Sequence, residues 1–156
     1  MPSSVNPKTI VLRGQPIRKE GLAGDVIVPG MLLGFDGSGD LIPHGVAGGN
    51  AAPAFADVSD FLGRTIDRPH FPEDELNDRP ADQVLYVVAA PGDEIYAFLA
   101  VGQNVAKGAF LESDGNGALR AFSNQANQFA AIVCRALEAA NNSAGRAAAR
   151  IRVEVM

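Results

Sequence analysis

Short apolar runs separated by glycine and proline recur along the whole chain, and they constrain its fold most. The 156 residues include 17 glycines and 10 prolines, which fall between these runs. Glycine supplies the positive φ angles of tight turns, and proline interrupts regular elements. The pattern is typical of many short strands joined by turns. We therefore predict an all-β fold, a small β-barrel or sandwich built from hairpins, as one domain over residues 1–156.

The strongest strand pattern lies in the middle of the chain. Val84–Ala89 and Glu94–Leu99 are apolar at almost every position and flank the turn residues Pro91-Gly92-Asp93. We predict that these two segments form a hairpin whose strands are buried on both faces. Near the end of the chain, Arg150–Val155 alternates charged and aliphatic residues, which predicts a half-buried strand.

Residues 129–140 (FAAIVCRALEAA) fit two elements. They contain good helix formers, so a helix is one interpretation. We favour a strand over Ile132–Ala136, because Asn141–Gly145 then forms a natural hairpin loop leading to the last strand.

Two segments of the chain are similar at a spacing of 78 residues. Residues 24–41 and 102–119 align without a gap and are identical at seven positions, mostly turn positions: Gly24/Gly102, Gly30/Gly108, Leu33/Leu111, Asp36/Asp114, Gly37/Gly115, Gly39/Gly117 and Leu41/Leu119. Each copy predicts a strand, a glycine turn, an apolar strand and an Asp-Gly-x-Gly hairpin. The similarity indicates an internal structural repeat, although turn-rich β proteins also reach such spacings by chance.

Two further segments are predicted to lie outside the regular core. Residues 1–13 form an extended N-terminal arm that ends in the strand candidate Thr9–Arg13. Residues 67–82 carry three prolines and many charges, which predicts a long surface loop.

Charge and cysteine content narrow the partners. The net charge is -5, and no Lys/Arg cluster could neutralise several phosphates, so we expect no nucleic-acid partner. The sequence contains no run of about 18 apolar residues, so we predict no membrane-spanning helix. The first residues lack the apolar core of a signal peptide. The single Cys134 excludes an internal disulfide and favours folding in a reducing cytoplasm.

No pattern in the sequence is a catalytic or metal-binding signature. His44 and His70 lie in different predicted loops, and neither has ligands at metal spacing. Asp93-Glu94 is interpreted as a polar turn, and Cys134 as a buried small side chain. We predict no catalytic residue, no cofactor and no metal, and therefore not an enzyme.

The pattern Gly102-x-x-Val105-x-x-Gly108-x-x-Leu111 resembles the hairpin entry of biotinyl and lipoyl carrier domains. Such domains present a modified lysine at the hairpin tip. The tip here, residues 113–117, has no lysine, and Lys107 precedes the turn glycine. The resemblance therefore favours a related hairpin more than a carrier function, which stays an alternative.

A second resemblance bears on function. Tyr86–Ala97, Leu111–Leu119, Ala131–Glu138 and Arg150–Val155 resemble the head decoration, or cement, proteins of tailed bacteriophages. The resemblance is clearest over residues 82–156 and weaker over residues 24–43. It implies a β-barrel-like structural protein of the virion. Such a protein is made in the host cytoplasm and then binds the capsid exterior, where it stabilises the lattice of the major capsid protein.

The same resemblance implies self-association, as a homotrimer or as a dimer. Thr9, Ile10, Val11, Leu12 and Arg13 are the predicted capsid contacts, because an extended segment can add a strand to an exposed sheet edge. The alternative is that these residues form the first strand of the protein's own sheet. A tail or spike β-domain is the alternative function within the virion.

Overall fold

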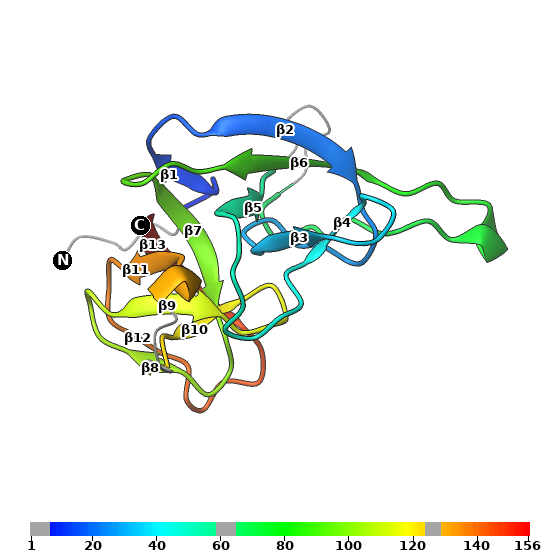
Figure 1. Cartoon of the computed structure of the whole chain (residues 1–156). Coiled ribbons are helices and arrows are strands. Elements are labelled where there is room, and N and C mark those ends of the chain that lie inside the picture. The colour runs from blue at the N-terminus through cyan, green and yellow to red at the C-terminus, as the bar shows by residue number, and fades with distance from the viewer. Residues whose placement is uncertain (1–6, 59–64, 124–128) are drawn as a thin grey trace.

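The computed structural model describes residues 7–58, 65–123 and 129–156, and the regular secondary structure of these residues is almost all β, as predicted (Figure 1). Two short 3-10 turns, η2 (Glu75–Asn77) and η3 (Phe129–Ala131), are the helical pieces among them. The strands are β1 Val11–Arg13, β2 Ile17–Leu22, β3 Leu33–Phe35, β4 Leu41–Pro43, β5 Ala54–Ala56, β6 Gln83–Val88, β7 Glu94–Leu99, β8 Asn104–Val105, β9 Phe110–Ser113, β10 Leu119–Ala121, β11 Cys134–Ala136, β12 Ala140–Asn141 and β13 Ala149–Val155.

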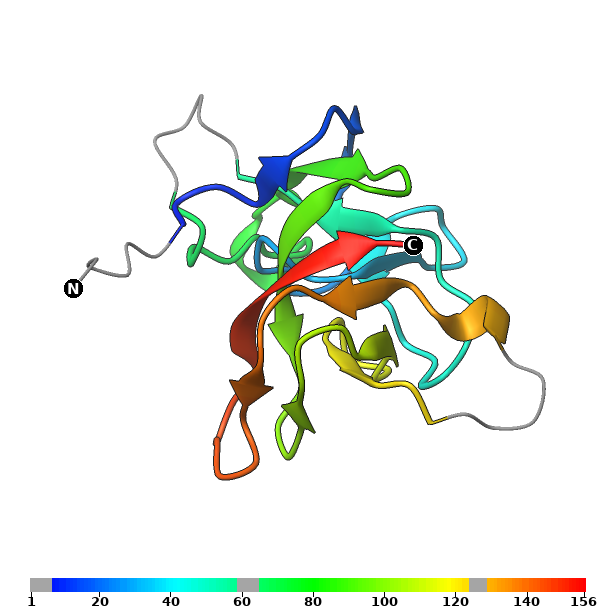
Figure 2. The same cartoon turned by 90° about the vertical axis from the view of Figure 1, so that its left-hand side faces the viewer.

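Five strands of the second half close into a barrel. The order is β7-β10-β9-β11-β13, and β13 pairs back to β7 over six residue pairs (Figure 2). All pairs are antiparallel except β10 with β7, which meet in parallel at Leu119 and Leu99. Closure leaves few unpaired strand edges in this half of the molecule.

The first half repeats this connectivity. β6 lies between β2 and β5, and β3 pairs with β4. Single bridges complete the circle, because Ala23 meets Leu41 in parallel and Leu32 meets Phe55 in antiparallel fashion. The circular order β2-β4-β3-β5-β6 therefore matches β7-β10-β9-β11-β13, and the chain consists of two related units, residues 17–88 and 94–155.

The two hairpins that the sequence aligns have the same register. Leu33 faces Pro43 in β3–β4, and Leu111 faces Ala121 in β9–β10, at the same spacing of 78 residues. The turn before each hairpin is equivalent too. Gly30 N donates to Ala56 O and Gly108 N to Ala136 O, both at 2.8 Å. The aligned glycines therefore occupy equivalent places in the two units.

Aspartate closes both hairpin tips in the same way. One oxygen of Asp36 accepts from the backbone N–H groups of Ser38 and Asp40, at 2.8 and 3.0 Å. The same oxygen of Asp114 accepts from Asn116 and Ala118, at 2.7 and 3.0 Å. Such Asx turns satisfy backbone donors that a tight turn leaves unpaired.

The predicted hairpin between Val84–Ala89 and Glu94–Leu99 is wrong. The turn exists, since Asp93 N donates to Ala90 O, but β6 pairs with β2 and β5 while β7 pairs with β1, β10 and β13. These strands close two different barrels, so the turn between them is the junction of the two units. The apolar pattern of both strands reflects burial within the units rather than mutual pairing.

The core lies in two clusters of buried side chains. One fills the first unit and includes Ile27, Leu41, Val84 and Tyr86. The larger one fills the second unit but also contains Phe55 and Val87 from the first, so the two units share packing. Burial alternates along β13, which confirms the predicted half-buried strand.

Residues 129–140 form a strand rather than a helix at their centre. After the 3-10 turn η3, β11 pairs with both β13 and β9. β-Pairing on both sides explains why good helix formers adopt an extended conformation here. No helix among the described residues has the length and apolar character needed to cross a membrane.

Candidate interaction surfaces

The one serine–histidine contact in the described chain is sealed inside the protein. His44 Nδ1 lies 2.6 Å from Ser113 Oγ, and His44 Nε2–H donates to Asn50 O at 3.1 Å. Ser113 has no solvent-accessible surface, and its hydroxyl oxygen accepts from Gly115 N. A buried nucleophile has no route to a substrate, so this pair fastens residues 44–50 of the first unit to the hairpin tip of the second. The two residues lie far apart in sequence, so sequence reasoning missed their contact.

Other potentially reactive side chains also have structural roles. Cys134 is fully buried, and desolvation raises the pKa of its thiol, which disfavours the reactive thiolate. His70 is buried where it bridges to Ile27. The carboxylate of Asp93 accepts from Ala90 N at 2.9 Å, so it closes the turn between the units. No group of three or more His, Cys, Asp or Glu residues in the described ranges could hold a metal ion.

The predicted capsid-contact segment lies at the edge of the second unit. β1 pairs with β7, and Tyr96 N donates to Ile10 O at 2.8 Å, so residues 10–13 of this segment join the protein's own sheet. Ile10 is fully buried in the larger core cluster. Thr9 and Arg13 remain exposed and Val11 and Leu12 half-buried. A capsid contact made by this segment would therefore use its outward-facing side.

The equivalent edge in the first unit carries no strand among the described residues. β2 is the counterpart of β7, and it pairs only with β6 and at its end with β4. Ala23 N donates to Asp82 O and Gly24 N to Leu41 O, so backbone groups of even-numbered residues in β2 face away from β6. Five of its six residues are exposed. Only residues 14–16 separate β1 from β2 in the chain, and we call β1 together with the bare edge of β2 the N-terminal face.

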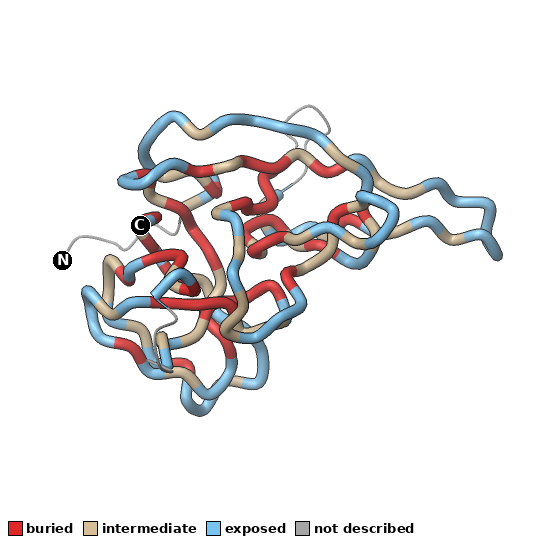
Figure 3. The backbone as a smooth tube through the Cα atoms, viewed as in Figure 1, coloured by how far each residue is buried: buried red, intermediate tan, exposed pale blue. Residues whose placement is uncertain are grey.

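A projecting arm, residues 71–82, is the most prominent feature of the outline (Figure 1). All of its residues are exposed or half-buried (Figure 3). Its base is fixed to the first unit, because Asp82 N donates to Phe71 O and Ala23 N donates to Asp82 O. At its tip, in η2, the side chain of Leu76 is 97% exposed.

The tip of the arm is held in one shape by hydrogen bonds. Asp74 and Arg79 exchange two backbone bonds of 2.8 and 2.9 Å. The Asp74 carboxylate accepts from Asn77 Nδ2 at 2.7 Å and from Leu76 N at 3.2 Å, and these bonds, Asn77's first, lower the pKa of Asp74. Asp78 adopts the left-handed conformation, with φ of 49°, that ends the turn. Leu76 is therefore presented on an ordered support.

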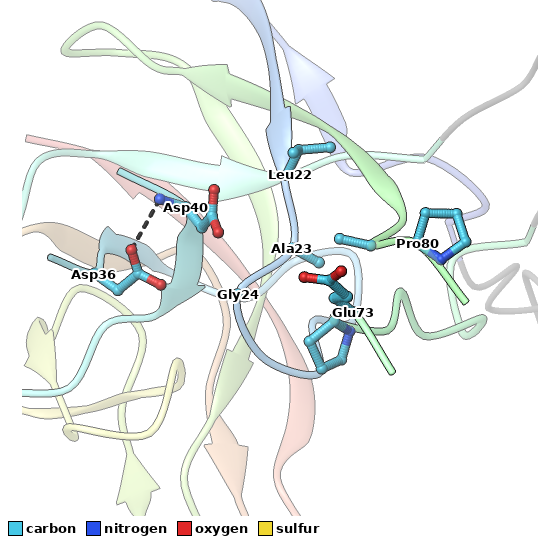
Figure 4. A pocket seen from close by; sticks show the side chains of 9 residues that line it. Leu22, Ala23, Gly24, Asp36, Asp40, Glu73 and Pro80 are labelled. Atoms are coloured by element: carbon cyan, nitrogen blue, oxygen red, sulfur yellow. Dashed lines mark hydrogen bonds between the residues drawn. The ribbon is translucent and has the colours of Figure 1, made fainter. Parts of the chain in front are cut away.

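Where the arm meets the first unit, an open pocket of about 400 Å³ lies between carboxylates (Figure 4). Asp36 and Asp40 come from the β3–β4 hairpin, and Glu73 comes from the arm. One oxygen of Asp36 already accepts two backbone bonds. The remaining carboxylate oxygens make this pocket suited to a cationic side chain.

An apolar depression of about 200 Å³ lies where the two units meet. Asn116 and Gly117 contribute to it, but most of its lining is apolar and comes from Val28, Met31, Phe98, Ala118, Ala147 and Ala148. Arg146, next to Ala147 in sequence, is exposed.

Charge differs between the two units. Residues 17–88 contain five Lys or Arg and twelve Asp or Glu, whereas residues 94–155 contain six and five. The acidic excess therefore belongs to the unit that carries the arm.

No protein-family model matches this chain, and no curated protein matches it.

Proposed function

We propose that this protein is a structural component of a bacteriophage virion that binds the capsid exterior and stabilises the major-capsid lattice, as the resemblance to decoration proteins implies. It associates with itself, as a homotrimer, and with the major capsid protein. It acts through its surfaces and turns over no substrate.

The bare β2 edge is the observation that carries the proposal. In the second unit β1 covers the corresponding edge of β7, so the fold already accepts a strand at this place. An extended segment of the capsid protein would add to β2 through the outward backbone groups of Arg18, Glu20 and Leu22. Repetition of this contact over the lattice gives strong binding from individually weak contacts.

Co-sedimentation of the purified protein with expanded capsids that lack it tests the proposal. We expect saturable binding at micromolar concentration. Glu20→Pro removes an outward N–H without disturbing the bonds to β6. We expect it to reduce the binding affinity at least about tenfold, which corresponds roughly to the free energy of one backbone hydrogen bond. Glu20→Ala is the matched control, because it loses the same side chain and keeps the N–H. Absence of binding by the wild-type protein would refute the capsid function, and equal binding by the two variants would refute strand addition.

Two alternatives are separated by simple measurements. A tail or spike component would be present in a few to dozens of copies per virion rather than hundreds, which quantitative gel analysis of particles distinguishes. A carrier domain would hold a covalently modified lysine, which intact-mass spectrometry detects. The carrier alternative has less support, because the hairpin tip at Gly115 packs against Ala47, whereas a carrier lysine stands free at its tip.

A further inference from the structure

The arm and the apolar depression are complementary in form. Isolated exposed leucines are common, so the exposure of Leu76 is not by itself informative. The surroundings of Leu76 are informative, however. The side chain is 97% exposed at the end of an arm whose turn is ordered by four hydrogen bonds that involve Asp74 and Arg79. An ordered support removes most of the entropy loss that a flexible loop would suffer on binding.

The depression fits such a side chain. Its volume of about 200 Å³ exceeds the roughly 150 Å³ of an apolar protein cavity that accepts benzene, so a leucine side chain has room in it. The arm points away from its own protein body in Figure 1, so the occupant must come from another molecule.

We infer that Leu76 of one copy inserts into the depression of a second copy. Charge supports this pairing, because Glu73, Glu75 and Asp78 lie within three residues of Leu76 in sequence and are exposed, while Arg146, which precedes Ala147 of the depression, is also exposed. The acidic excess of the arm-bearing unit would likewise meet the less acidic remainder of the next copy. The partner copy thus contributes a residue that completes the site.

The geometry of this contact also determines the form of the assembly. The arm and the depression are different patches, so the contact is heterologous, and repeated contacts of this kind close into a ring when the rotation permits. The inference rests on the self-association within the proposed function and is independent of capsid binding.

Disulfide trapping between two variants, each with one added cysteine, tests the contact. Leu76→Cys and Ala147→Cys are purified separately, mixed and oxidised mildly, and a non-reducing gel measures the cross-linked heterodimer. The native Cys134 is fully buried, so wild-type protein should give no cross-link. Ile17→Cys, whose site on β2 is 63% exposed, replaces Ala147→Cys in the control mixture.

We expect at least about tenfold more cross-link in the Leu76–Ala147 mixture than in the control, because a specific contact raises the local thiol concentration. The double variant should give a covalently closed ring. Equal yields in both mixtures would overturn the contact. Light scattering of wild-type protein separates the causes: an oligomer with equal yields means that the interface lies elsewhere, and a monomer means that the proposed self-association is wrong as well.

Discussion

At the residue scale, Arg150 joins parts of the molecule that are distant in sequence. Its guanidinium donates to Pro29 O at 2.5 Å and to Ile66 O at 2.6 Å, and it lies 4.1 Å from the centre of the Phe98 ring. Burial lowers the pKa of Arg150, and Asp67 opposes that shift. A β13 side chain thereby fastens the first unit to the barrel of the second.

Replacing Arg150 should therefore destabilise the protein. Arg150→Met keeps the contact with Phe98 but leaves the carbonyl groups of Pro29 and Ile66 without their donor, at a cost of about 2–3 kcal/mol of unfolding free energy. Urea denaturation measures the change. Arg152→Met, on the same strand but exposed, is the control and should change stability by less than about 0.5 kcal/mol. Similar losses in both variants would contradict the role given to Arg150.

The two Asx turns allow a paired test of the internal repeat. Asp36→Ala and Asp114→Ala each remove an acceptor of two backbone bonds and should each destabilise by about 1–2 kcal/mol. Asp36→Asn and Asp114→Asn retain an acceptor oxygen and should lose less. Thermal melts of the four variants check this. The equivalence of the two turns would fail if only one site responded, or if asparagine were as harmful as alanine.

At the scale of elements, the sequence predicted individual turns and strands better than it predicted which strands pair. The glycine and aspartate spacing identified both hairpins, and alternation identified β13, because turn chemistry and burial act on neighbouring residues. The partners of β6 could not be predicted, because an apolar pattern indicates that a strand is buried but not which strand it pairs with. The relation between the complete units was also hidden, because residues 57–82 replace the shorter connection 137–148 between the equivalent strands.

Among the candidate surfaces, sequence indicated the arm as a loop and Thr9–Arg13 as a strand. It could not show that no described strand covers the outer edge of β2, because that depends on where β1 pairs. The apolar depression draws on residues 28–31, 98, 116–118 and 147–148, which only the fold brings together.

The rest of the protein should fold and remain stable without the arm. Replacing residues 72–81 with Asn-Gly joins Phe71 to Asp82, which are already hydrogen-bonded, by a two-residue hairpin turn. We expect the melting temperature to stay within about 4 °C of wild type, since less than about 1 kcal/mol of packing is lost. Self-association, measured by sedimentation, should disappear. A shortened protein that still forms the wild-type oligomer would exclude the arm from the interface.

Acid should loosen the tip of the arm. The folded-state pKa of Asp74 is lowered, chiefly by the hydrogen bond from Asn77, so its stabilising contribution is present above the ordinary aspartate pKa and is lost as the pH falls through the lowered value. The protection factor of the Leu76 amide, which is its hydrogen-exchange rate corrected for the intrinsic pH dependence of exchange, should fall across that range, because this amide donates to Asp74. Asp74→Asn does not titrate and should remove the pH dependence; an unchanged profile in this variant would exclude Asp74 as the cause.

At the scale of the whole molecule, the two units share a topology and differ in their surfaces. The second unit has its β7 edge covered by β1, whereas in the first unit no strand of the described ranges covers the outer edge of β2, and this unit carries the acidic arm. A duplicated scaffold of this kind separates stability from recognition, because the strands of both barrels fix the core while edges and loops remain free to bind. The proposed division assigns the N-terminal face to the capsid and the arm to a neighbouring copy.

The most direct test is cryo-electron microscopy of the mature particle with and without this chain. We expect difference density at repeated positions on the outer surface, with β2 against a capsid strand and the arm reaching an adjacent copy. Particles with identical outer surfaces in the two maps, or density for this chain confined to the tail, would contradict the account.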